Sequence, residues 1–77
     1  MDRQDFEDLR SRHQQVLLDF LNRELDLGFA FASRGSRDTA LRAVLAVERL
    51  VDQVEDRVDR RKIDERLVDL NEAIHKL

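Results

Sequence analysis

Large apolar residues recur at helical spacing through the first part of the chain. Intervals of three and four residues separate the members of one series: Phe6, Leu9, His13, Val16, Phe20, Leu27 and Phe31, with one interruption near residues 23–24. A second series lies on its flank: Leu17, Leu21, Leu25, Gly28 and Ala32. Such intervals place side chains on one face of an α-helix. The pattern predicts a helix from about residue 3 to about residue 33.

The segment after this helix has the residues of a turn. Gly35 suits the left-handed backbone conformation that follows a helix end, because it has no β-carbon. Ser36 can cap the next helix through its hydroxyl, and Asp38 brings a negative charge to its first turn. A turn over residues 33–37 is too short for anything but an antiparallel helix pair.

Two further apolar series follow the turn, and they are out of phase. The first contains Leu41, Val44, Leu45, Val51, Val54 and Val58. The second contains Ile63, Leu67, Leu70, Ile74 and Leu77. The five-residue step between them rotates the apolar face by about 140° across the polar segment 59–62.

This phase change leaves two interpretations open. Neither glycine nor proline occurs at 59–62, which favours a second helix over about residues 37–77, continuous or kinked. Alternatively, the chain breaks near 59–62 and a third helix folds back. Strand patterns are absent from the sequence, so both interpretations give an all-α fold of one domain over residues 1–77.

The C-terminal series predicts a surface between subunits. On a continuous helix, Ile63, Leu67, Leu70, Ile74 and Leu77 would lie beyond the first helix and need a cover. A chain of 77 residues without cysteine also has no disulfide to stabilise a small core, so regular helix packing or a second copy must serve. We therefore expect a homodimer.

Composition argues against several functional classes. The net charge of −3 disfavours a nucleic-acid partner, and no apolar stretch approaches the length of a bilayer span. The charged start has no signal-peptide pattern, so a cytoplasmic location is expected. Glu72 and His75 form the one Glu-x-x-His pair, and no catalytic triad or phosphate loop occurs. We expect no metal, no cofactor and no enzymatic activity.

Two smaller features are candidates for contacts. Arg34 and Arg37 flank Gly35 beside the free amides of a helix start, where an anion or an acidic partner could bind. His13 lies within the apolar series of the first helix and has no histidine three or four residues further on. It is therefore interpreted as a packing residue at a helix or subunit interface.

The spacing around the turn resembles one tetratricopeptide repeat, over about residues 21–54. Leu27-Gly28 is followed by Phe31, Gly35, Ala40 and Val44, with Gly28 and Ala40 small where two helices cross. Glu24 and Asp52 depart from the motif, at its early aromatic and its closing proline. The resemblance implies a protein-binding or self-associating scaffold. An alternative is a small regulatory adaptor or antitoxin-like chain that binds a heterologous protein.

Overall fold

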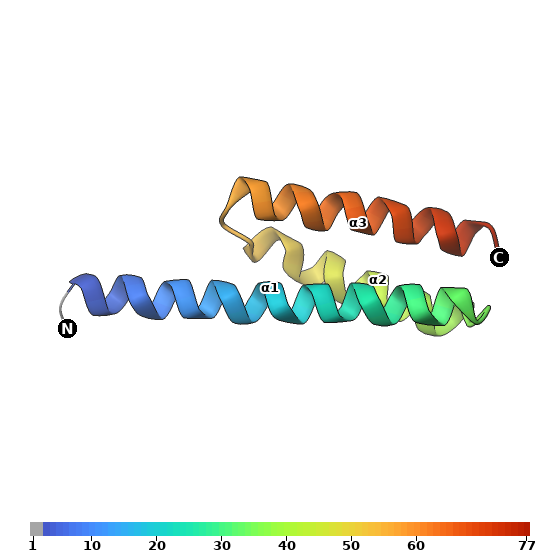
Figure 1. Ribbon diagram of the computed structural model, residues 1–77, viewed down its shortest axis with the longest axis horizontal. Coiled ribbons are helices and arrows are strands. Elements are labelled where there is room, and N and C mark those ends of the chain that lie inside the picture. Colours follow the sequence, from blue (N-terminus) through green and yellow to red (C-terminus); the bar gives the residue numbers. More distant parts are fainter. Residues whose placement is uncertain (1–2) are drawn as a thin grey trace.

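A computed structural model describes residues 3–77 and shows three α-helices and one short 3₁₀-helix (Figure 1). The helices are α1 (Arg3–Ser33), α2 (Arg37–Leu50), η1 (Val51–Gln53) and α3 (Arg57–His75). No strand occurs among these residues, so the all-α prediction is confirmed. None of the described helices has the length and hydropathy needed to cross a membrane.

The helices run up, down and up, and α1 is far longer than either of the others (Figure 1). Its 31 residues span about 46 Å, whereas the 14 residues of α2 span about 21 Å. The molecule is correspondingly elongated, with extents of 51 × 18 × 15 Å. The N-terminal part of α1, drawn in blue, projects beyond both other helices.

The turn between α1 and α2 is the one that Gly35 predicts. Gly35 has a φ of 77°, and its N–H donates to the carbonyl of Ala32 at 3.0 Å. The N–H of Ser36 donates to the carbonyl of Phe31 at 2.9 Å. These two bonds form a Schellman motif, which satisfies carbonyls at the end of α1. Ser36 occupies the N-cap position of α2, but its side chain makes no capping bond, contrary to the prediction.

The second helix does not continue to the C-terminus. It ends at Leu50, η1 follows, and Val54 is extended with a ψ of 119°. The alternative with a third helix is therefore correct, but the break precedes the predicted segment 59–62, which lies in the first turns of α3. Asp56 starts α3, since its carboxylate accepts hydrogen bonds from the N–H groups of Val58 (2.9 Å) and Asp59 (3.0 Å).

One apolar core joins all three helices. Its most deeply buried large side chains are Leu21 and Leu25 of α1, Val47 of α2, and Ile63, Leu70 and Ile74 of α3. Gly28 lets the helices approach: a β-carbon there would lie 3.2 Å from Cβ of Ala43 and 2.6 Å from Cδ2 of Leu70. The small residue of α2 that faces Gly28 is thus Ala43, although Ala40 is also fully buried.

Candidate interaction surface

The two apolar series of α1 have opposite roles in the structure. Leu17, Leu21, Leu25, Gly28 and Ala32 are buried in the core. The longer series is largely left in solvent: Phe6, Leu9, Val16, Phe20 and Leu27 are 40–66% exposed, and His13 is exposed with them. We call these six residues the α1 outer face. Burying large apolar side chains away from water lowers the free energy, so such a face is a candidate site for a partner.

The α1 outer face repeats every seven residues. From Phe6 to Phe20 its members follow alternating steps of three and four, and Leu27 follows one heptad after Phe20; these are the a and d positions of a heptad repeat. Phe6, His13, Phe20 and Leu27 take the a positions, and Leu9, Val16, Arg23 and Ala30 take the d positions. The repeat covers about 32 Å of helix from Phe6 to Leu27. This is the pattern of a helix that packs lengthwise on another helix.

Shallow depressions follow this face on both sides of His13. One is lined by Phe6, Leu9, Arg10 and His13. The other is lined by His13, Val16, Leu17 and Phe20 of α1, with Leu50 of α2 and Gln53 of η1. The second depression shows that the end of α2 borders the α1 outer face. A partner helix on α1 would therefore also approach Leu50 and Gln53.

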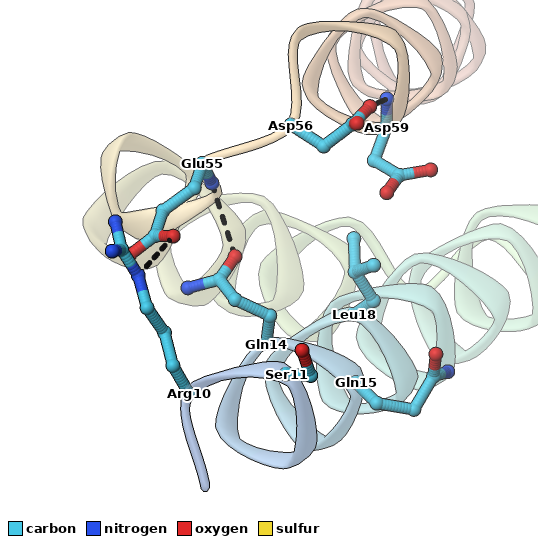
Figure 2. A pocket seen from close by; sticks show the side chains of 8 residues that line it. All are labelled: Arg10, Ser11, Gln14, Gln15, Leu18, Glu55, Asp56 and Asp59. Carbon is cyan, nitrogen blue, oxygen red and sulfur yellow. Dashed lines mark hydrogen bonds and ion pairs between the residues drawn. The ribbon is translucent and has the colours of Figure 1, made fainter. Parts of the chain in front are cut away.

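A second surface feature lies where the segment before α3 meets α1 (Figure 2). Gln14 clamps this segment: its Nε2 donates to the carbonyl of Gln53 and its Oε1 accepts from the N–H of Glu55, each at 3.0 Å. Nε of Arg10 donates to the Glu55 carboxylate at 2.7 Å and 3.0 Å. This hydrogen bond, together with the negative charge of Glu55, raises the pKa of the Arg10 guanidinium.

The groove beside this clamp is lined mostly by polar side chains. Ser11, Gln15 and Leu18 of α1 face Asp59 of α3 and Asp56, the N-cap residue before it, across the groove (Figure 2). The carboxylate of Asp56 already caps α3, and that of Glu55 already binds Arg10. These groups therefore have structural roles, and the arrangement contains no nucleophile with an adjacent base.

The residues of the predicted subunit interface lie mostly inside the single chain. Ile63, Leu70 and Ile74 are buried at 2% exposure or less, Leu67 packs against the core, and Leu77 is 52% exposed. Folding back after α2 lets α1 and α2 cover this series. The reason for expecting a second subunit at this series therefore no longer applies, and the longest row of exposed apolar side chains lies on α1 instead.

The other predicted contact residues lie at the surface, and the structure does not bring the arginines of the turn and the two histidines together into one site. Arg34 and Arg37 are exposed at the tip of the α1–α2 turn, where contact with an anion or an acidic partner stays a prediction. His13 and His75 are exposed on different helices. Across residues 3–77, no group of three histidine, aspartate or glutamate side chains is arranged to hold a metal ion.

Comparisons with known proteins do not place the chain in a family. No family model matches it, and neither the curated proteins nor the solved structures give a match. The function of the α1 outer face is therefore inferred from its own residues.

Proposed function

We propose that this protein is a non-catalytic interaction protein that self-associates through the α1 outer face. The observation that carries this proposal is the exposure of Phe6, Leu9, Val16, Phe20 and Leu27. They lie along the a and d positions of one heptad repeat, and we call this line of positions the seam of α1. A face of this kind gains most from a partner helix that has the same repeat. A second copy of the chain supplies such a helix, and a two-fold pair would bury the part from Phe6 to Phe20 of both seams at once.

The rest of the molecule supports an interaction role. The groove in Figure 2 is open at the surface, and two of its carboxylates already have partners: Glu55 binds Arg10, and Asp56 caps α3. We further propose a cytoplasmic location. Kinship with tetratricopeptide repeats also remains a proposal. The tight turn at Gly35 and the burial of Ala40 agree with it, whereas the contact of Gly28 with Ala43 in place of Ala40 departs from the motif.

Sedimentation equilibrium tests self-association. We expect the wild-type chain to be a dimer at micromolar concentration and the variant Leu9→Glu/Val16→Glu to be a folded monomer, because each charge would be buried in the seam. Val68→Glu is the matched control: Val68 is 56% exposed on α3, away from the seam, so this variant should remain dimeric. A monomeric wild-type chain that melts cooperatively would contradict the proposal.

The alternative is a regulatory adaptor for a heterologous protein, which would use the same seam. Purification from the native source distinguishes self-association from binding to a heterologous protein. A stoichiometric second protein that is lost with Leu9→Glu/Val16→Glu would favour the adaptor, whereas the chain alone at twice its monomer mass favours self-association.

A further inference from the structure

We infer that the two copies pack antiparallel, with Leu9 opposite the partner's Phe20 and Arg12 beside the partner's Asp19. This inference rests on the proposed self-association and specifies its geometry. Helices can share a heptad seam in parallel or antiparallel orientation, and in several registers. The charges beside the seam and the uncovered length of α1 select among these arrangements.

In an antiparallel pair, each a residue lies opposite a d residue of the partner. The register proposed here has its two-fold axis between Gln14 and Gln15. It places Leu9 opposite the partner's Phe20 and His13 opposite the partner's Val16, each contact occurring twice. At the ends, Phe6 meets the partner's Arg23, whose aliphatic stem can cover the ring while its charged group reaches water.

The charges beside the seam favour this register. The g positions, which lie beside g positions of the partner in an antiparallel pair, are Asp5, Arg12, Asp19 and Asp26. Arg12 and Asp19 are exposed, and no ion pair joins either of them to another residue within 3–77. The proposed register gives two Arg12–Asp19 pairs between the copies. It also brings Asp5 beside the partner's Asp26, but the Asp26 carboxylate already forms an ion pair with Arg66, which offsets this repulsion.

Other registers place like charges together. Sliding one copy by one heptad puts Arg12 beside the partner's Arg12 and Asp5 beside the partner's Asp19. Sliding it the other way puts Asp19 beside the partner's Asp19, and the Arg12 side chain then meets Asp26, whose carboxylate already pairs with Arg66. A parallel pair would place Asp19 beside the partner's Glu24 and Arg23 opposite the partner's Arg23. Like charges in contact oppose association, so each of these arrangements is disfavoured.

The shape of the molecule also fits an antiparallel pair. The N-terminal part of α1 projects beyond α2 and α3 (Figure 1). Within residues 3–77, Arg10 is the most N-terminal residue that hydrogen-bonds the rest of the bundle. An antiparallel pair lays this projecting part along the half of the partner's α1 that carries the bundle. A parallel pair would leave both projecting parts together, with no bundle beside either.

Disulfide trapping distinguishes the arrangements, because the chain has no cysteine of its own. In the proposed register, a mixture of Leu9→Cys and Phe20→Cys chains should cross-link to each other under mild oxidation, while neither variant cross-links alone. Val68→Cys serves as the control for random collision. Cross-linking of Leu9→Cys with itself would show a parallel pair. Failure of the mixture to cross-link, with the wild type still dimeric, would overturn the register.

Charge reversal gives a second, independent test. Arg12→Asp places four carboxylates where two ion pairs should form, and we expect dimer affinity to fall on the order of tenfold. Arg12→Asp/Asp19→Arg restores opposite charges and should recover the wild-type affinity. The difference in dimer affinity between the wild type and Arg12→Asp should shrink in about 1 M salt, because salt screens the charges. If the double variant is as weak as the single one, these residues do not face each other. A monomeric wild type would instead refute the proposed function itself.

Discussion

The side chain of Leu70 fills the space that a β-carbon on residue 28 would need. Cδ2 of Leu70 would lie only 2.6 Å from that atom, and Cβ of Ala43 would lie 3.2 Å from it. Gly28 is therefore the point where α1, α2 and α3 come together. Because Leu70 is fully buried, its side chain has no solvent-filled space into which it can turn.

Replacing Gly28 with alanine should lower the free energy of unfolding by about 1 kcal/mol. Alanine favours a helix interior by about 0.5–1 kcal/mol, so the crowding against Leu70 and Ala43 must exceed this gain. Urea denaturation measures the difference. In a Leu70→Val background, where the clashing methyl group is absent, the same substitution should become stabilising. A stabilising Gly28→Ala in the wild-type chain would show that the contact is not tight.

Asp56 should contribute measurably to the start of α3. Its carboxylate accepts from the N–H groups of Val58 and Asp59, so Asp56→Ala should cost about 1 kcal/mol of stability. Asp56→Asn keeps an acceptor and should cost much less. Thermal denaturation followed by circular dichroism provides the comparison, with Asp69→Ala as a control on the exposed surface of the same helix. Equal effects of the alanine and asparagine variants would argue against the cap.

Local signals in the sequence predicted the hairpin correctly. Gly35 alone indicates a left-handed residue after a helix end, and the structure has that conformation at φ 77°. The start of α3 also had a local signal, an aspartate at position 56 with a second acid at 59, typical of a helix N-terminus. The five-residue step from Val58 to Ile63 instead indicated that any break would fall within 59–62. Val58 is 61% exposed, so it does not belong to the buried series.

The choice of buried face could not be predicted from spacing. Two adjacent stripes of α1 are apolar, and residues recur at intervals of three and four in both. Which one is buried depends on where α2 and α3 pack, and hence on the fold-back after Leu50. Contacts between distant residues have no local signal either. Arg66 of α3, for example, donates to the side chains of Asn22 (2.7 Å) and Asp26 (2.5 Å) and lies over Phe29.

Gln14 should hold the segment between η1 and α3 in place. Loss of its two hydrogen bonds in Gln14→Ala should destabilise the chain by about 1–2 kcal/mol and speed amide hydrogen exchange at Glu55. Gln15→Ala is the control, because the side chain of Gln15 donates to Asp19 on its own helix and does not hold the segment before α3. Gln14→Glu should be at least as harmful as the alanine variant, since a carboxylate cannot donate to the carbonyl of Gln53. Unchanged exchange at Glu55 would contradict the clamp.

His13 should limit the strength of the proposed dimer. It is the polar residue at an a position of the α1 outer face, between Leu9 and Val16, and a polar side chain there lowers coiled-coil stability. His13→Leu should therefore tighten self-association on the order of tenfold, measured by sedimentation equilibrium. The stability of a dissociated chain should change little, because His13 is exposed in the single chain. His75→Leu, at an exposed histidine on α3, controls for added hydrophobicity. Equal tightening by both variants would mean that His13 does not lie in the seam.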